Sequence, residues 1–417
     1  MKIGIIGGGA AGIMAAATII EESQKQGIDV PEVLLFEKNP GIGRKVIISG
    51  GGRCNVTTGI QEVREVLQKY PRGKKFLNKA LYHFPPTDIY EWFEAHGVPL
   101  KTEADMRVFP VSDDGKDIVR VFEELFAESA SSLHLKTGIV EVIKQGKLFM
   151  LITSTDQTIE VDKLIITTGG QAYRHTGSTG DGYAFAERLG HTVTKTAPSL
   201  NSFILSEKWT TELSGVSFEN IVLTVPGHKE YYAEGPIVFT HQGMSGPAVF
   251  ALSAQVAFEN YTKQQPLAMH IDFVPDMSFD ELRNQIKKEF EDQPKRFVVK
   301  TLQQWLPKSV LHQMMMQLDI EDGKNAECSK KNIERMIHWI KKCEVHAIGR
   351  GAGSEFVTAG GVELKEVNPK TMESKVCPGL FFAGEVLNVD GVTGGFNLSA
   401  SWAAGRLAGL HAAEIND

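Results

Sequence analysis

The first twelve residues carry glycines at Gly7, Gly9 and Gly12, between an apolar stretch at 3–6 and a small-residue stretch at 10–23. A strand, a Gly-x-Gly-x-x-Gly turn and a helix in this order form the first unit of a dinucleotide-binding fold. The first glycine makes the tight turn, the second admits a diphosphate, and the third lets the helix pack on the strand. The helix N-terminus then offers free N–H groups and a positive dipole end to the diphosphate.

An acidic residue follows at the distance that this fold requires. The next apolar stretch, VLLFEK at 33–38, carries Glu37 at its end, 25 residues after Gly12. A carboxylate at that point can accept both hydroxyls of an adenosine ribose. The structural alternative is a tight turn beside a surface glutamate. The spacing favours the nucleotide site.

Glycine is enriched, at 41 of 417 residues, and gathers in clusters beside apolar stretches. The segment GIGRKVIISGGGRCN (41–55) offers backbone amides that could wrap a diphosphate and a flavin, and IITTGG (165–170) resembles a strand that ends in paired glycines. GLFFAGE (379–385) and then GGFNLS (394–399) place a helix start where the flavin O2 would lie. The dipole of that helix would stabilise reduced flavin. These clusters predict FAD. No second unit of this kind is apparent, so NADH or NADPH, if it is the electron donor, has no dedicated pocket.

The composition bounds the class of protein. A net charge of −7 argues against a chain that coats nucleic acid or membrane over its whole surface. Four cysteines exclude a disulfide scaffold, and the histidines form no ligand pattern, so no metal is expected. No apolar run reaches the roughly 18 residues of a transmembrane helix. The apolar N-terminus resembles a secretory signal, but its glycine cluster and Glu21-Glu22 interrupt the pattern. We expect a cytoplasmic protein with no membrane partner.

The pattern along the chain changes twice. Residues 139–168 predict three antiparallel strands, at 139–144, 147–154 and 161–168. Residues 195–275 alternate apolar and polar side chains and are β-rich, whereas 276–345 is mainly helical. The C-terminal stretch again shows the pattern of the N-terminus, an apolar strand followed by glycines and a small-residue helix. The fold class is therefore α/β, with a split Rossmann-like domain at 1–194 and 346–417 that binds FAD or NAD(P), and an inserted domain at 195–345.

Several longer motifs resemble one known family. They are SGGGRCN, TGSTGDGYAFAERLGHT, FTHQGMSGPAV, TAGGV with NPKTMESK, and GLFFAGEVLNVDGVTGGFNLSASWAAGRLAG. In the same order and over nearly the whole chain, they resemble the BaiN/RdsA-like flavoproteins, which are often labelled NAD(FAD)-utilising dehydrogenases. The resemblance implies an FAD domain of the glutathione-reductase type and an insert that is part β-barrel-like and part helical.

The resemblance also implies which residues contact FAD. Val140 would lie against the adenine at the head of the 139–168 strands. The full set is Gly7, Gly9, Ala11, Gly12, Glu37, Lys38, Arg44, Ser49, Gly51, Asn55, Val140, Thr168, Gly169, Gly384, Glu385, Asn397 and Leu398.

Two side chains are candidates for proton transfer, and each has a structural alternative. Cys54 lies among glycines near the expected flavin and could protonate a substrate carbon, but a free cysteine is commonly a small buried filler. His241 occupies the polar turn FTHQGMSGP and could face the flavin, but it could equally be a structural histidine.

We expect an FAD-dependent oxidoreductase that reduces a C=C conjugated to a carbonyl by hydride from flavin N5. The family implies two substrates, an unsaturated steroid-like acid or a nucleobase in ribosomal RNA, reduced to dihydrouridine. Residues 281–350 hold 14 Lys and Arg against 10 Asp and Glu, which indicates either a solvated helical face or an RNA-binding surface. A flavin-binding structural or sensor protein without turnover is the alternative. The substrate and the oligomeric state stay open.

Overall fold

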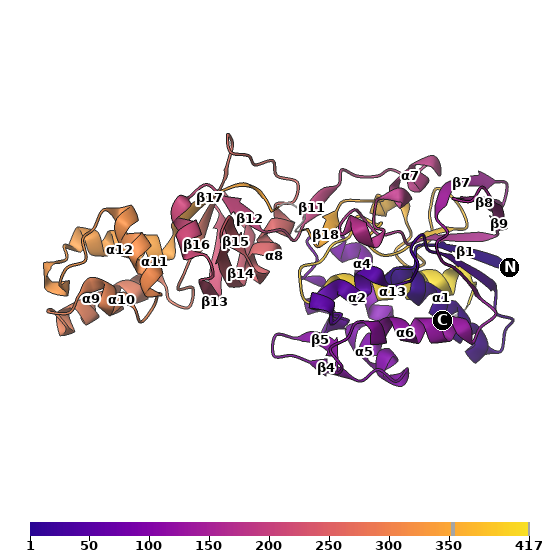
Figure 1. Ribbon diagram of the computed structural model, residues 1–417, viewed down its shortest axis with the longest axis horizontal. Coiled ribbons are helices and arrows are strands. Elements are labelled where there is room, and N and C mark those ends of the chain that lie inside the picture. The colour runs from indigo at the N-terminus through magenta and orange to yellow at the C-terminus, as the bar shows by residue number, and fades with distance from the viewer. Residues whose placement is uncertain (352–354, 416–417) are drawn as a thin grey trace. The chain divides into compact units, whose positions relative to one another are not determined.

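A computed structural model describes residues 1–351 and 355–415, apart from the side chains at 229 and 230. The chain divides into two compact units, which Figure 1 shows as ribbons. Unit 1 consists of Met1–Ser199 with the segment from Phe356 onward, and unit 2 is Leu200–Glu355. Each unit is described by itself.

The centre of unit 1 is a five-stranded parallel sheet in the order β19-β10-β1-β2-β6. Its strands are β1 (Lys2–Ile6), β2 (Glu32–Phe36), β6 (Ser132–His134), β10 (Lys163–Ile166) and β19 (Leu380–Phe382). The strands are mostly continuous apolar runs because both faces of the sheet are covered. Strand β19, near the C-terminus, lies beside β10, so the sheet combines strands from both ends of the chain, and the α/β fold class is confirmed.

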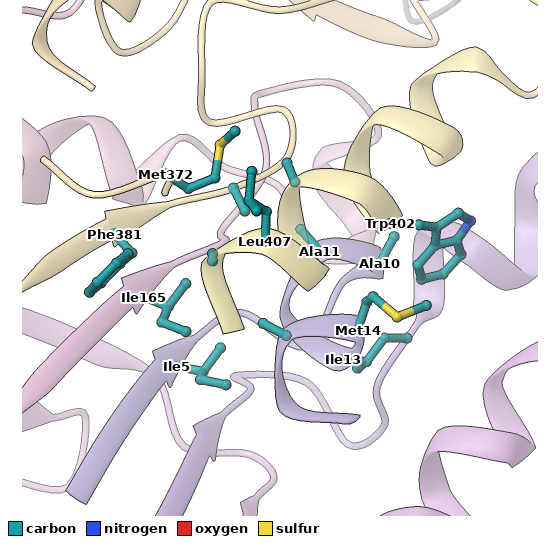
Figure 2. Packing of buried hydrophobic residues seen from close by; sticks show 14 of the residues in the cluster. Ile5, Ala10, Ala11, Ile13, Met14, Ile165, Met372, Phe381, Trp402 and Leu407 are labelled. Carbon is teal, nitrogen blue, oxygen red and sulfur yellow. The ribbon is translucent and has the colours of Figure 1, made fainter. Parts of the chain in front are cut away.

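Two helices of small residues pack closely against each other beside this sheet, α1 (Ala10–Gln26) and α13 (Phe396–Ala412). A Cβ atom at Gly405 would lie 2.3 Å from the Ala11 carbonyl oxygen, and one at Gly409 would lie 2.5 Å from that of Ala15. Figure 2 shows Ala11 of α1 and Leu407 of α13 in one cluster with strand residues such as Ile5. Glycine is required wherever the two helix backbones approach this closely.

The strands at 139–168 differ from the prediction in one respect. The antiparallel group consists of β7 (Ile139–Gln145), β8 (Leu148–Thr153) and β9 (Thr158–Val161). The expected third strand, 161–168, is divided, because β10 leaves the group and pairs in parallel with β1 and β19. The apolar run of β10 buries both faces, which suits the central sheet rather than a half-exposed hairpin.

Shorter elements of unit 1 surround the sheet. Strand β11 (Ala197–Ser199) pairs antiparallel with β18 (Val357–Ala359), so the chain leaves unit 1 and returns to it along one two-stranded ribbon. The remaining elements used below are α2 (Arg44–Ile48), β3 (Thr57–Thr58), α3 (Val63–Leu67), α4 (Lys74–His83), α5 (Pro86–Ala95), β4 (Leu100–Thr102), β5 (Arg107–Pro110), α6 (Lys116–Ala127) and α7 (Asp181–Arg188).

Unit 2 contains a closed barrel in the order β12-β15-β14-β13-β16-β17. Its strands are β12 (Phe203–Leu205), β13 (Ser217–Val225), β14 (His228–Thr240), β15 (Gly243–Ser245), β16 (Leu267–Asp272) and β17 (Cys343–Arg350), with α8 (Pro247–Gln255) beside them. Helices α9 (Phe279–Asp292), α10 (Val298–Leu302), α11 (Lys308–Leu318) and α12 (Lys330–Lys341) follow β16. The expected boundary at 345 falls inside β17, which pairs with β16 and β12 and so belongs to the barrel.

No helix in the described part of the chain is both long and apolar enough to span a membrane.

Candidate functional site

The glycine turn of unit 1 connects β1 to α1, and each of its glycines has a different reason to lack a side chain. Gly7 has a φ of 108°, and a Cβ there would lie 2.7 Å from the Thr167 carbonyl oxygen. A Cβ at Gly12 would lie 2.0 Å from the Gly7 oxygen, so this glycine permits the packing of helix on strand. Around Gly9 a Cβ would meet no described atom within 4 Å. That open space lies at the N-terminus of α1, where Ala11 is buried in the first turn.

Glu37 follows β2 and is held against this turn. Its Oε2 accepts a hydrogen bond from the Gly8 amide at 2.9 Å, and its Oε1 accepts from the backbone and side-chain nitrogens of Asn39 at 2.8 and 2.7 Å. These bonds fix the carboxylate beside the open end of α1. An ionised carboxylate has further lone pairs with which to accept ribose hydroxyls.

The basic residues near Glu37 have partners within the chain. Lys38 Nζ lies 2.6 Å from Asp181 Oδ2, and Arg44 donates to Asn39 Oδ1 at 2.8 Å. Val140, the expected adenine contact, is 55% exposed on β7. The structure thus places an accessible apolar side chain at this position, and its contact with adenine stays a prediction.

The segment 41–55 presents bare backbone to open space. After α2 the chain turns at Ser49–Gly52, where Gly51 has a φ of 75° and Gly52 a φ of 92°. A Cβ at either glycine would meet no described atom within 4 Å. Ser49 Oγ donates to the Val46 carbonyl, and Asn55 Oδ1 accepts from the Val108 amide at 3.2 Å, so these side chains hold the loop itself.

Cys54 belongs to the same segment and is fully buried within the core of unit 1. Its amide donates to the Ser49 carbonyl, and its φ is 61°. Burial raises the pKa of the Cys54 thiol to about 12, so the sulfur stays protonated near neutral pH. This environment matches the structural alternative for Cys54. Its role in proton transfer stays a prediction.

The strand end at 165–170 contributes an unsatisfied hydroxyl. Thr168 Oγ1 is buried and has no hydrogen-bond partner among the described residues. Gly169 follows with a φ of 72°, and Gly182 at the start of α7 comes so close that a Cβ there would lie 2.1 Å from Thr168 Oγ1. A buried hydroxyl without a partner is unusual and fits a site that a polar ligand completes.

The segment after β19 leads into the N-terminus of α13. Gly384 has a φ of 79°, and a Cβ there would lie 2.9 Å from Ala11 Cβ. The Asn397 side chain accepts from the Gly391 amide and donates to the Gly391 carbonyl, both at 2.8 Å, which closes the loop before the helix. The first amides of α13, including that of half-buried Leu398, have no acceptor within the helix. They form a positive end suited to an anionic group.

His241 belongs to the other unit. It is exposed in the turn between β14 and β15 of the barrel. Cys54 and His241 therefore lie in different units.

Sequence reasoning missed four residues of this region. Lys45 forms an ion pair with Glu385, and Arg72 forms one with Asp390. Thr358 of β18 donates its amide to Glu385 Oε1 at 2.7 Å. Their partners are distant in sequence, so no local spacing indicates these contacts. Lys45, Thr358 and Asp390 had a signal, since they lie in the motifs GIGRKVIISGGGRCN, TAGGV and GEVLNVDGVTGGFN, whereas Arg72 lies in none of the quoted motifs.

The residues present fit FAD. Open backbone at Gly9, Gly51 and Gly52, the fixed carboxylate of Glu37 and the unsatisfied Thr168 hydroxyl form the cradle that a dinucleotide needs. No group of three or more His, Cys, Asp or Glu side chains within 1–351 and 355–415 is arranged to hold a metal ion.

The fold and the site define an FAD-dependent oxidoreductase with a split dinucleotide-binding domain. The chain belongs to the HI0933-like family, because the family model described as "HI0933-like protein Rossmann domain" matches residues 1–411. The resemblance to BaiN/RdsA-like flavoproteins is confirmed.

Relatives in this family have two different names. The chain is 30% identical to the 3-dehydro-bile acid delta(4,6)-reductase of Clostridium scindens, over 99% of each chain. It is also 30% identical to the ribosomal RNA dihydrouridine synthase of Haemophilus influenzae, over 97% of each. Among solved structures, a mutant of Escherichia coli quinol fumarate reductase FrdA matches with a TM-score of 0.51 and 15% identity, over 99% of this chain and 70% of that one. That likeness concerns the fold alone.

Proposed function

We propose that the protein reduces a carbon–carbon double bond conjugated to a carbonyl, with NADH or NADPH as the source of electrons. The observation that carries this proposal is the equal likeness, over almost the whole chain, to two relatives whose names both describe the saturation of such a bond. When bound, FAD would supply the hydride through N5 of its reduced ring.

The residues of unit 1 bind and orient the cofactor in this proposal. The turn at Gly7–Gly12 and the N-terminus of α1 hold the diphosphate, and Glu37 accepts the ribose hydroxyls. The N-terminus of α13 would lie at the pyrimidine end of the flavin, where its positive dipole end would stabilise negative charge. Hydride transfer to one carbon requires a proton for the other, and Cys54 and His241 are the candidates for holding that proton.

Ribosomal RNA is the first substrate that we propose, because the helices of unit 2 carry exposed cations. Lys288 and Lys342 are exposed, whereas Lys341 is buried, with its Nζ 2.6 Å from Asp272 Oδ2. Lys341 therefore stabilises the fold, and we do not propose it as an RNA contact. A cytoplasmic location is part of this proposal.

The test compares ribosomal RNA from a deletion strain with that from the same strain carrying the gene on a plasmid. A position that is dihydrouridine in the complemented strain but uridine, two hydrogens lighter, in the deletion strain supports the RNA substrate. Lys288→Glu with Lys342→Glu should then lower RNA reduction and its salt dependence. The FAD content should not change, because both residues lie outside unit 1.

An unsaturated steroid-like acid is the second candidate, favoured by the match to the bile acid reductase over 99% of this chain. With purified protein, loss of the absorbance of a 3-oxo-4,6-diene acid, driven by NADH or NADPH, would support it. Bound FAD that NADH and NADPH do not reduce, or that neither acceptor reoxidises, would contradict both and favour a flavin-binding protein without turnover.

A further inference from the structure

Asp390 is a fully buried carboxylate in the loop between β19 and α13. It accepts hydrogen bonds from both Nε and a terminal nitrogen of Arg72, and from Ser199 Oγ at 2.8 Å. Burying a charge is unfavourable unless it is paired and hydrogen-bonded, and this fork-on-carboxylate geometry is the strong form of such a pair. The hydrogen bonds from Arg72 and Ser199 therefore offset the unfavourable free energy of burying the Asp390 carboxylate in this loop.

The segment 69–73 also holds the part of the loop that follows Asp390. The Val392 amide donates to the Lys69 carbonyl at 2.9 Å, and Tyr70 OH donates to the Phe396 carbonyl at 2.7 Å. A Cβ at Gly391 would lie 3.0 Å from the Tyr70 ring. These contacts leave the loop little freedom to move.

The loop next to Asp390 determines where α13 begins. The Asn397 side chain binds both backbone groups of Gly391, which makes residues 391–397 a closed ring. The last residues of this ring form the first turn of α13, and a Cβ at Gly395 would lie 2.1 Å from the Thr57 carbonyl. A shift of Asp390 would therefore shift the free amides of the helix start.

We propose that Asp390, held by Arg72 and Ser199, is a positioning residue that fixes the N-terminal turn of α13 against the pyrimidine end of FAD. Ser199 ends β11, where the chain leaves for unit 2, so the same carboxylate also ties that exit strand to the cofactor segment. The proposal rests on the flavin chemistry proposed above, but it is independent of which substrate is reduced.

The test measures the FAD dissociation constant, the flavin midpoint potential and the apoprotein melting temperature, all without substrate. In Asp390→Asn the helix start should relax away from the flavin, so reduced FAD loses about tenfold in binding relative to oxidised FAD. This change corresponds to a potential ~30 mV more negative. Arg72→Lys keeps the charge but loses the fork, and should give a smaller shift of the same sign. Arg120→Gln, which removes an exposed cation on α6, is the matched control and should change none of the three.

If Asp390→Asn does not fold, Ser199→Ala and Tyr70→Phe provide the test. The first removes the hydrogen bond from Ser199 to Asp390, and the second removes the bond from Tyr70 to the Phe396 carbonyl at the start of α13. A more negative potential in these folded variants supports the proposal. A lower melting temperature with an unchanged potential would show a merely structural role and overturn it. Failure of the wild-type protein to bind FAD would instead contradict the cofactor assignment.

Discussion

Lys45 and Glu385 form an ion pair across 340 positions of sequence. The pair joins the glycine-rich segment 41–55 to the segment that follows β19. Glu385 is mostly buried and also accepts a hydrogen bond from the Thr358 amide, so the carboxylate connects these two segments with strand β18. The two segments are thus connected by the protein's own charges.

Replacing Lys45 with methionine should weaken FAD binding by about tenfold, or roughly 1.4 kcal/mol, because the two segments lose their connection. Isothermal titration of the apoprotein with FAD measures this effect. Lys25→Met is the control, since Lys25 is exposed and pairs with Glu22 near the C-terminal end of α1, the opposite end of that helix from the glycine turn. Equal affinities in the two variants would contradict a role for Lys45 in the site.

Glu37→Ala should raise the FAD dissociation constant by about 1–3 kcal/mol in free energy, because a charged acceptor of the ribose hydroxyls is lost. Glu32→Ala is the control. Glu32 begins β2, at the end of that strand away from Glu37, and its exposed carboxylate pairs with Lys2 of β1, so its loss should leave the dissociation constant unchanged. An unaltered constant in Glu37→Ala would mean that the ribose lies elsewhere.

Two glycines of the turn should respond in opposite ways to alanine. Gly9→Ala should leave the melting temperature of the apoprotein within a degree or two but block the diphosphate, because the added Cβ meets only open space. Gly12→Ala should destabilise the fold itself by about 1–3 kcal/mol or more, since its Cβ would overlap the Gly7 carbonyl. Tight FAD binding by Gly9→Ala would contradict the assigned diphosphate site.

Cys54 should make the protein sensitive to alkaline pH. Its pKa is raised by burial from 9.0 to about 12, so the protonated thiol favours the folded state. This stabilisation is complete below pH 9 and is lost as pH rises towards 12, by up to about 1.4 kcal/mol for each pH unit. Denaturant unfolding of wild type and Cys54→Ala between pH 8 and about pH 11 measures the slope. The same slope in both proteins would assign it to other groups.

Activity assays separate the two proton-donor candidates. His241→Ala or Cys54→Ala should lower the rate of substrate reduction by about 10²-fold or more if that side chain is the donor. The rate of flavin reduction by NADH or NADPH should not change, since that step needs no proton from either residue. A loss of only a few-fold would remove that residue from the mechanism.

Residues 200–355 should fold without the rest of the chain, because the barrel is closed and has its own buried core. A fragment of this range should melt cooperatively in circular dichroism. Limited proteolysis of the whole protein should cut near 190–200 or after Arg350, the last residue of β17, rather than inside that barrel strand. A fragment without a cooperative transition would contradict an independent domain.

The parts that could be predicted from sequence are those whose causes are local. The turn from Gly7 to Gly12 and the strand just before Glu37 follow from spacing within a short segment, because backbone strain and burial act there at short range. The division of 161–168 between two sheets could not be predicted, since it depends on the distant partner β19. The pairs Lys45–Glu385 and Arg72–Asp390 were missed for the same reason, because only folding brings their partners together.

The position of β19 and α13 has a consequence for synthesis. A ribosome releases the barrel and its helices before it releases the final strand and helix of the parallel sheet. Unit 2 can therefore finish folding while unit 1 still has an open sheet edge and an uncovered α1. Domains commonly fold in order as they emerge, but here the first half must wait for the last forty residues or so. Until those residues arrive, the nascent chain has no flavin pocket, and its exposed apolar surface is a natural target for chaperones.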